Sequence, residues 1–460
     1  MQTTKVSFDL QEKNSCVNGM IEDFFDTFHI GSLLNRSGIR KIRGARPLAI
    51  FTAIFSLPFK GVNFYWGIVQ NRELGFLKDS VYNALRRPNF NWRLFLLSLS
   101  VIVSRFFHNM TDVSRETVFI LDDSIFDRSR SKMVELLTRV YDHSTKMYLK
   151  GFRFLSMVWS DGASTVPVDF AIVSSTDEKN RYQGITKNLD KRCCGFRRRT
   201  EALKAITELL EPMVKRAIRA GLIAKYILMD SWFAFPSIIK DLSDHLPVIC
   251  MLKRMPNVFY TLNGLKLNLK ALYRTVKKRP GKARIVASVC VYISPEQMVK
   301  IIFVRDRRKN DWLAILSTDV QLSDTEIVRI YGKRWDIEVF FKMSKQYLQL
   351  EKGVQMRDFD GIVAHTTIAL VRYLFLSYRQ RCDTDPRTIG SLFRASCDEI
   401  NDITLIDALK RILVFVVDAL HNAEITSEQF IQKIIDDIMG TVLEKMNLKI
   451  LCTNYLIAPK

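Results

Sequence analysis

The chain has 460 residues, of which 48% are hydrophobic and 25% are charged, with only 19 Gly and 12 Pro. This composition excludes a disordered, collagenous or low-complexity protein, and the length predicts about two to four folded domains. The 69 Lys and Arg exceed the 48 Asp and Glu and give a net charge of +21, which indicates a polyanionic partner, with nucleic acid first and an anionic membrane surface second.

Hydropathy and cysteine spacing exclude several further classes of protein. The longest run without a charged residue, Pro47–Phe59, is shorter than the roughly 20 residues of a membrane span. The first residues show no basic stretch followed by an apolar one, so no secretory signal is expected. The eight Cys form no CxxC pair and no Cys/His cluster, which predicts neither a zinc site nor a disulfide framework and fits a reducing cytoplasm.

Residues 1–112 are predicted to form a helical domain that binds DNA. Residues 36–105 carry twelve bases and two acids, a net charge of +10. Apolar residues recur there at helical spacing, in segments that a bundle would bury. These segments are Met20–Phe28, Leu48–Phe55, Val62–Ile68, Val81–Leu85 and Leu94–Phe107.

Two parts of this basic region are predicted to contact DNA. Asp79 can cap a short helix, Ser80–Arg87, which Pro88 ends. A recognition helix and a bundle helix with a solvated basic face fit that pattern equally well. The Gly-broken stretch 35–46 is better explained as a loop that contacts phosphates. The candidate contacts are Arg40, Lys41, Arg43, Arg86 and Arg87.

The pattern changes near residue 117 and predicts an α/β core of the ribonuclease-H-like type. The expected order is three strands, a helix, a strand, a helix and a strand. The strands are Val118–Leu121, Phe152–Trp159, Val166–Val173, Tyr226–Met229 and Val248–Leu252, and the helices are about 200–220 and Pro236–Leu242. We therefore predict a catalytic domain at 113–355 with a β-rich insertion at 253–320, followed by a helical region at 356–460.

Four acids lie where such a core places a site. Asp122 and Asp123 are expected to end the first strand, Asp230 to end a later strand, and Glu338 to lie in a helix that begins near residue 324. Carboxylates so placed can hold two Mg²⁺ ions for phosphoryl transfer, because hard divalent ions take oxygen ligands. The alternative is that they are ordinary turn and cap carboxylates.

The helix that carries Glu338 has a more specific pattern. Tyr331, Arg334, Glu338 and Lys345 fall within an arc of about 60° on one helix face, at about 100° per residue. This stripe combines groups that bind an anion with a carboxylate that binds a metal. The alternative is an exposed Arg–Glu ion pair, which would stabilise the helix only slightly.

The same four residues match the Y-(2)-R-(3)-E-(6)-K signature, so the chain resembles the DDE transposases of bacterial insertion sequences, of the cut-and-paste insertion sequence four superfamily. Asp-Asp-Ser at 122–124 and Asp-Ser-Trp-Phe at 230–233 are also similar to that family. The resemblance covers about residues 115–350.

The resemblance implies particular roles. It makes the Asp that precedes Ser the first catalytic acid, here Asp123, with Asp122 as the alternative, beside Asp230 and Glu338. These acids would hold two Mg²⁺ ions, which Mn²⁺ can replace. Tyr331 and Arg334 would position a DNA-end phosphate and Lys345 would contact DNA.

The remaining candidates carry weaker signals. Lys253 and Arg254 are expected to line the DNA channel, although a solvated strand end fits equally well. Trp232 is expected to pack in its turn, His143 to lie on the surface, and Asp127 to lie too far along the chain to join the acids. No GxxxxGK motif is present, so no nucleotide cofactor is expected.

The sequence therefore predicts a DNA transposase that acts in the bacterial cytoplasm, at the nucleoid. It would bind the terminal inverted repeats of its element, cleave the ends and join the 3′-OH ends to target DNA. The alternatives are a ribonuclease-H-like nuclease without strand transfer and a non-catalytic DNA-binding derivative. The apolar helical segment 400–460 predicts a homodimer contact on DNA, although packing on the catalytic domain explains it equally well.

Overall fold

The computed structural model describes residues 17–382, apart from 42–43, 72–73, 113, 144, 282, 307–310 and 354–355. The described residues from Phe24 to Cys382 belong to one compact unit, and positions 112 and 355, where the predicted domains meet, both lie within its span. The segment 400–460, expected to mediate pairing, lies outside the described residues.

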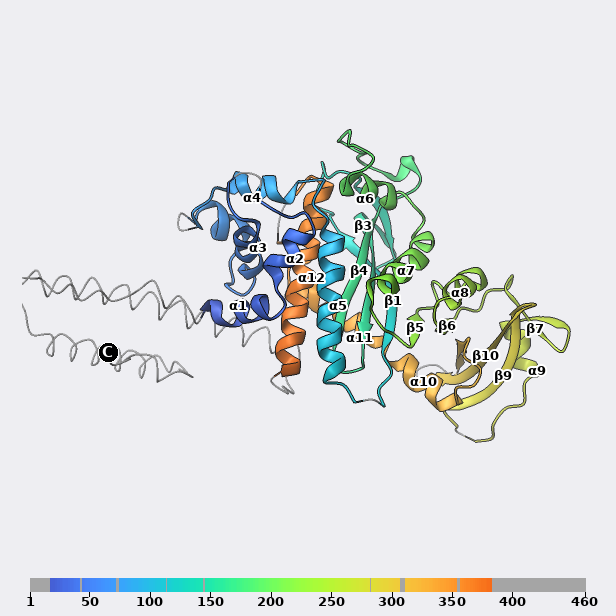
Figure 1. Ribbon diagram of the computed structural model, residues 1–460. Helices are drawn as coiled ribbons and strands as arrows, with labels where there is room; N and C mark the ends of the chain where they lie inside the picture. Colours follow the sequence, from blue (N-terminus) through green and yellow to red (C-terminus); the bar gives the residue numbers. More distant parts are fainter. Residues whose placement is uncertain are drawn as a thin grey trace, which may run out of the picture. The chain divides into compact units, whose positions relative to one another are not determined.

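Among the described residues, a mixed sheet of eleven strands organises this unit (Figure 1). Its central strand β1 pairs antiparallel with β3 on one side and parallel with β5 on the other. Beyond them, β4 pairs antiparallel with β3, and β6 pairs parallel with β5. This mixed order is consistent with the predicted ribonuclease-H-like core. The strands are β1 Val118–Asp127, β2 Thr138–Asp142, β3 Met147–Ser160, β4 Thr165–Val173, β5 Tyr226–Met229 and β6 Val248–Leu252.

The strands expected between residues 253 and 320 are present and extend the same sheet. β11 pairs antiparallel with β6, and β10, β9, β7 and β8 follow in that order. The elements are β7 Phe259–Leu262, β8 Leu265–Asn268, α9 Leu269–Thr275, β9 Ile285–Ser294, β10 Gln297–Asp306 and β11 Asp311–Ser317.

The N-terminal region is helical, as predicted, with one local difference. The helix expected to begin after an Asp79 cap instead begins at Lys78, where no side chain caps it, so Asp79 lies in its first turn. By contrast, Asn91 caps α5 by accepting a hydrogen bond from the Leu94 amide at 3.0 Å. The helices are α1 Val17–Thr27, α2 Ile30–Arg36, α3 Pro47–Ser56, the π-helical turn η1 Tyr65–Val69, α4 Lys78–Leu85 and α5 Trp92–Asn109.

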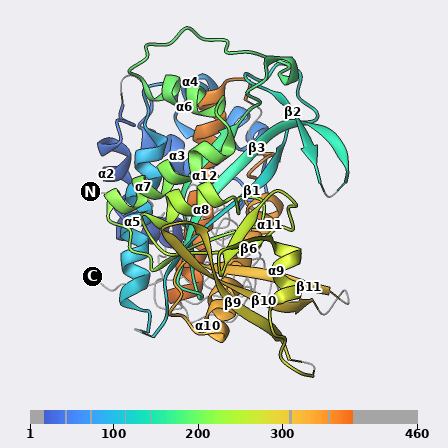
Figure 2. The ribbon, with the colours of Figure 1, turned by 90° about the vertical axis from the view of Figure 1, so that its right-hand side faces the viewer.

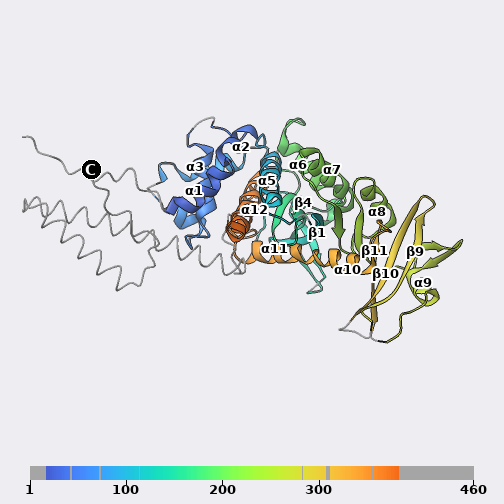
Figure 3. The ribbon, with the colours of Figure 1, turned by 60° about the horizontal axis from the view of Figure 1, so that its bottom comes forward.

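The helix expected at about 200–220 is two helices with a short 3₁₀ turn between them. Ala205 adopts an extended conformation, and its amide donates to the Glu208 carboxylate at 3.2 Å, which begins a new helix there. Figure 3 shows α7 and α8 on one side of the sheet and α10 (Asp324–Gly332) and α11 (Trp335–Gln346) on the other. The elements are η3 Glu178–Asn180, α6 Cys194–Ala202, η4 Ile206–Leu209, α7 Leu210–Ala220 and α8 Pro236–Ser243.

The long helix α12 (Phe359–Cys382) forms the centre of the helical packing. Its Phe375 ring contacts the rings of Phe24, Phe55 and Phe59 at centroid distances of 5.6, 5.8 and 5.4 Å. By length and apolar composition α12 could cross a membrane, but its apolar stretch is wholly buried inside the protein, and core helices commonly meet the same test. α12 also lies beside α5 (Figure 1) and packs on β4. The N-terminal helices therefore share a core with the sheet.

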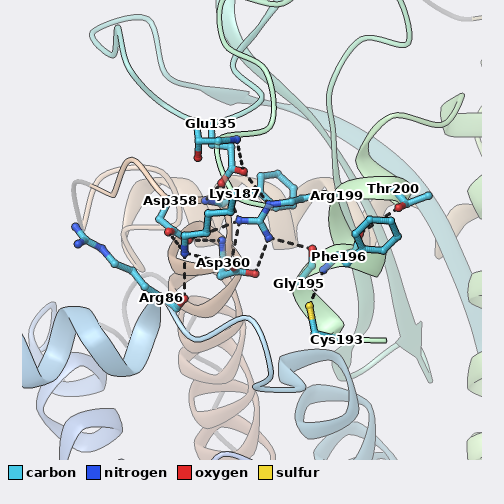
Figure 4. A network of polar contacts seen from close by, with 12 residues as sticks. Arg86, Glu135, Lys187, Cys193, Gly195, Phe196, Arg199, Thr200, Asp358 and Asp360 are labelled. Carbon is cyan, nitrogen blue, oxygen red and sulfur yellow. Dashed lines mark hydrogen bonds and ion pairs between the residues drawn. The ribbon is translucent and has the colours of Figure 1, made fainter. Parts of the chain in front are cut away.

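A buried ion-pair network fixes the start of α12 (Figure 4). The Arg199 guanidinium on α6 is 1% exposed; it donates to the Glu135 carboxylate at 2.7 and 2.8 Å and to the Asp360 carboxylate at 2.9 Å. The Phe359 amide also donates to Glu135, at 3.1 Å. Burial alone would raise the pKa of Glu135, but the hydrogen bonds and charge of Arg199 outweigh it and lower that pKa.

Removing the cation from this network should be costly. Arg199→Met removes the guanidinium that pairs with two buried carboxylates and should lower the free energy of unfolding by about 3–5 kcal/mol at neutral pH. The pKa of Glu135 is lower in the folded protein than in the unfolded chain. Ionised Glu135 therefore adds to the free energy of unfolding above its ordinary pKa, and this contribution is lost as the pH falls through the lowered pKa of the folded protein. The deficit of the variant should therefore narrow on acidification. Denaturant titrations at several pH values measure both effects.

Arg192→Met is the matched control, because Arg192 pairs with Asp190 on the surface and its side chain is 88% exposed. Its change should stay within about 0.5 kcal/mol. If the two variants lost equal free energy of unfolding, the buried network would contribute no more to stability than a surface ion pair.

Candidate active site

The strand that carries the first acids is longer than predicted. β1 does not end at Asp122 and Asp123 but runs on to Asp127, because β3 pairs with it throughout its length. Asp122 lies opposite Ser156, and Asp123 lies opposite Leu155. Since side chains alternate along a strand, the two acids point to opposite faces of the sheet.

Helix α11 (Trp335–Gln346), which carries Glu338, covers the face to which Asp122 points. Ser160 of β3 donates a hydrogen bond to the Asp336 carboxylate at 2.6 Å, and the Phe154 ring lies 6.0 Å from the Phe341 ring. Ser160 and Phe154 share a face of β3 with Ser156, the partner of Asp122.

Arg334 joins the two acids of this face. One guanidinium nitrogen lies 3.6 Å from the Asp122 carboxylate, and the other donates to Glu338 Oε1 at 2.5 Å. The structure therefore brings Asp122, Arg334 and Glu338 together.

Asp230 lies beside Asp122 at the edge of the neighbouring strand. Leu121 and Met229 are the last paired residues of β1 and β5, and Asp122 and Asp230 follow them directly. Burial, followed by the negative charges of Asp123 and Asp230, raises the pKa of Asp122 to about 7. The charge of Arg334 opposes this shift.

Asp123 occupies a different environment from Asp122. It forms an ion pair with Arg153, which follows the same face of β3. Burial raises the pKa of Asp123, while Arg153 opposes the shift. Motif resemblance selected Asp123, but strand alternation turns its side chain away from the helix of Glu338, so the geometry favours Asp122.

The predicted helix from residue 324 is interrupted beside the site. α10 (Asp324–Gly332) ends where the Arg334 amide donates to the Tyr331 carbonyl and the Asp336 amide to the Lys333 carbonyl, each at 3.0 Å. These three-residue spacings form a tight turn whose dihedral angles remain helical. Tyr331 consequently stays near Arg334, with 5.8 Å between its ring centre and the guanidinium carbon.

Lys345 is at the far end of the predicted stripe and is held by the protein itself. Its ammonium group donates to the Ile125 carbonyl of β1 and lies 2.9 Å from the Glu351 carboxylate. It therefore ties α11 to β1, next to the acids.

The structure gathers part of the predicted N-terminal contact set. Arg40, Lys41 and Arg87 line a cavity of about 290 Å³ between the loop before α3 and helix α4. The Arg86 guanidinium lies over the Tyr82 ring at 5.0 Å. Arg43 lies outside the described residues.

Lys253 and Arg254 follow β6 but differ in their contacts. Lys253 is exposed, with its ammonium 5.3 Å from the centre of the Trp232 ring. Arg254 pairs with Asp311 at 2.8 Å and stacks over the Trp312 ring at 3.9 Å, so it is held within the insertion. Trp232 itself is 41% exposed, contrary to the expected packing role.

Sequence reasoning missed strand β2 and the role of Arg153. The available signal for β2 was the alternation of Thr138, Arg139 and Val140, which are buried, exposed and buried in turn.

Within the described parts of residues 17–382, no three His, Cys, Asp or Glu side chains are grouped closely enough to hold a metal ion as they stand. Arg334 lies between Asp122 and Glu338 and supplies the positive charge there. The candidate ligands nevertheless suit a hard divalent ion, because they are carboxylates and such ions prefer oxygen ligands.

Two family models match the chain. One, described as a DDE superfamily endonuclease, matches residues 75–261, and the other, described as a transposase DDE domain, matches residues 197–375. The matches show a DDE-superfamily transposase or endonuclease domain, which suggests a nuclease-type enzyme. The first includes Asp122, the second includes Glu338, and both include Asp230.

No curated protein matches the sequence. The NurA nuclease from Sulfolobus solfataricus is similar at 12% identity and a TM-score of 0.23, over 62% of this chain and 85% of that chain. The Drosophila P element transposase in its strand transfer complex is similar at 12% identity and a TM-score of 0.22, over 56% of this chain and 55% of that chain. Both similarities are weak.

The hydrogen bond from Ser160 should anchor the helix of Glu338. Ser160→Ala leaves the half-buried Asp336 carboxylate without its donor, so the free energy of local opening of α11 should fall by about 1.5–3 kcal/mol. Hydrogen exchange of the α11 amides measures this change.

Ser344→Ala provides the control on the same helix, because the Ser344 hydroxyl is buried without a hydrogen-bond partner among the described residues. Exchange that accelerates equally in both variants would argue against a specific anchor at Ser160.

Proposed function

We propose that this protein is a DNA transposase of the bacterial insertion-sequence type, with Asp122, Asp230 and Glu338 as its catalytic acids. The observation that carries the proposal is the shared site of these acids: Asp122 and Glu338 meet at Arg334, and Asp230 follows the adjacent strand. The two family matches support the chemical class.

The three carboxylates would hold the divalent metal, with Mg²⁺ as the expected ion and two ions as the expected number. Bound there, such ions activate an attacking oxygen and stabilise a leaving one. Asp122 and Glu338 can face one cation together only when Arg334 leaves the position between them.

Arg334 is placed to couple DNA binding to this rearrangement. Its guanidinium now pairs with two carboxylates, and a DNA phosphate offers the same bidentate partner. We infer that an incoming end phosphate draws Arg334 away, with Tyr331 beside it, and leaves the acids free to face the metal. The resemblance of the Tyr331, Arg334, Glu338 and Lys345 spacing to the insertion-sequence signature supports these roles.

In the proposed reaction, water attacks a phosphodiester at each element end, and the freed 3′-OH then attacks target DNA. The first step breaks the phosphodiester to leave a 3′-OH and a 5′-phosphate. The second forms a new phosphodiester and expels a 3′-OH from the target strand. Binding of terminal repeats and a DNA-bound homodimer belong to this proposal.

Asn and Gln substitutions of the acids test the assignment. Asp122→Asn, Asp230→Asn and Glu338→Gln should each reduce cleavage in Mg²⁺ by more than about a hundredfold, because even changes outside a metal's own ligands cost tenfold to a hundredfold. Binding of end DNA should stay nearly unchanged, because basic residues supply most of the affinity. Gel-based cleavage and binding assays measure the two effects.

Asp123→Asn is the matched comparison, one residue away on the opposite face. It should retain cleavage better than Asp122→Asn, and the reverse order would restore Asp123 as the first acid. A Glu338→Gln protein that cuts normally would reject the assigned site. Precut ends with a 3′-OH separate the two enzyme classes, because a nuclease without strand transfer would not join them to target DNA.

The bases around the N-terminal cavity should contribute to the salt dependence of DNA binding. Replacing Arg40 and Lys41 together by Ala should reduce the slope of log affinity against log salt by about 0.9 for each phosphate that the protein no longer neutralises. Titrations of end DNA at several salt concentrations measure the slope.

Lys60→Ala is the control, since Lys60 is exposed in the same helical region but does not line the cavity. An unchanged slope in the double variant would place the phosphate contacts elsewhere.

A further inference from the structure

Four aromatic rings form a continuous row beside the proposed acids, here called the aromatic platform. It consists of Tyr148, Tyr141, His143 and Trp232. Their successive centroid distances are 5.0, 5.0 and 5.4 Å. The first three belong to the β2–β3 hairpin, which projects from the rest of the sheet in Figure 2.

Three of the four rings of the platform are open to solvent, and Tyr141 is half-buried. Tyr148 is 58% exposed and Trp232 is 41% exposed, and His143 is also exposed. Rings that served only as packing would be covered, because burial of their apolar surface is what stabilises a fold. The exposure of the row indicates a binding surface.

Positive side chains are interleaved with these rings. The Arg139 guanidinium lies 3.7 Å from the centre of the Tyr148 ring. At the other end of the row, Arg153 and Lys253 lie 5.9 and 5.3 Å from the centre of the Trp232 ring. A surface with stacking faces and cations together matches an unpaired nucleic-acid strand, whose bases stack and whose phosphates are anionic. Paired DNA hides its base faces and would use only the cations.

The row ends close to Asp230 in the sequence and, through Arg153, contacts Asp123, the neighbour of Asp122 on the opposite face of β1. Trp232 comes two residues after Asp230, and Arg153, which lies over Trp232, also pairs with Asp123. We propose that the aromatic platform binds an unpaired stretch of DNA strand next to the cleavage site. The proposal rests on the proposed function for its location beside catalytic acids, while the affinity for unpaired strand belongs to the platform alone.

Binding measurements without divalent metal test this proposal on the full chain. Fluorescence anisotropy in EDTA would compare a labelled single-stranded oligonucleotide with a blunt duplex of the same sequence. Trp232→Ala and Tyr148→Ala should each weaken single-strand binding about tenfold to a hundredfold, the range for loss of one stacked base. Duplex binding should change by less than about twofold, since the cations remain.

The conservative variants Trp232→Phe and Tyr148→Phe keep a stacking face and should retain most of the single-strand affinity. Tyr292→Ala is the matched control, because Tyr292 is 40% exposed on β9 in the insertion, outside the platform. Circular dichroism would establish that each variant is folded.

Unchanged single-strand affinity in both alanine variants would overturn the proposal, as would an equal loss for duplex and single strand in folded protein. Loss of single-strand binding alone would support it. This result is independent of the cleavage test. A protein that does not cleave DNA but still binds single strands through the platform would reject the transposase reaction and not the platform. A protein that cleaves normally but whose single-strand binding does not depend on the platform would reject the platform only.

Discussion

The buried ion pairs of Arg199 with two carboxylates hold together three segments that are far apart in the chain. Glu135 comes from the segment before β2, Arg199 from α6, and Asp360 from the first turn of α12. Each of these charged groups can remain buried only because a group of opposite charge lies next to it. The path of the chain from β1 to β2 and the start of the central helix are therefore fixed by the same guanidinium.

A second buried arginine extends this arrangement to the N-terminal helices. Arg372 of α12 donates to the carbonyls of Ile54 and Phe55, at the end of α3, and to the carbonyl of Leu348, which follows α11, at 2.6, 3.1 and 2.7 Å. Burial lowers its pKa to about 9. One side chain thereby donates to carbonyls at the end of α3 and connects the proposed DNA-contact region to the segment that follows the helix of Glu338.

In the proposed site, one arginine balances the charge of two of the acids. Arg334 neutralises Asp122 and Glu338, at the tight turn between α10 and α11. A guanidinium on a long side chain can exchange carboxylate for phosphate with little change in the backbone. Trp232, two residues after Asp230, is exposed, so the contacts to phosphates and to bases that we propose would be made from adjacent surfaces.

Much of the architecture follows from local sequence. Hydrophobic runs predicted β5 and β6 with their observed bounds, because strands buried on both faces are continuous apolar segments. Strands expected in the β-rich insertion are also present. Helix ends were less predictable: Glu208 starts a new 3₁₀ turn and Lys333–Arg334 interrupts a longer helical pattern, and both depend on hydrogen bonds that periodicity does not specify.

The sequence by itself determined the acid types, the spacing of Tyr331, Arg334, Glu338 and Lys345, and the basic N-terminal region. Only the tertiary structure shows that α11 lies over the face of Asp122 and not over that of Asp123. They are adjacent and chemically identical, and the choice depends on the side of β1 that α11 covers. The structure likewise decided that Lys345 is tied to β1 and that the rings of the β2–β3 hairpin meet Trp232. A strand's alternation is local, but the identity of its covered face is set by packing between distant segments, which no short motif contains.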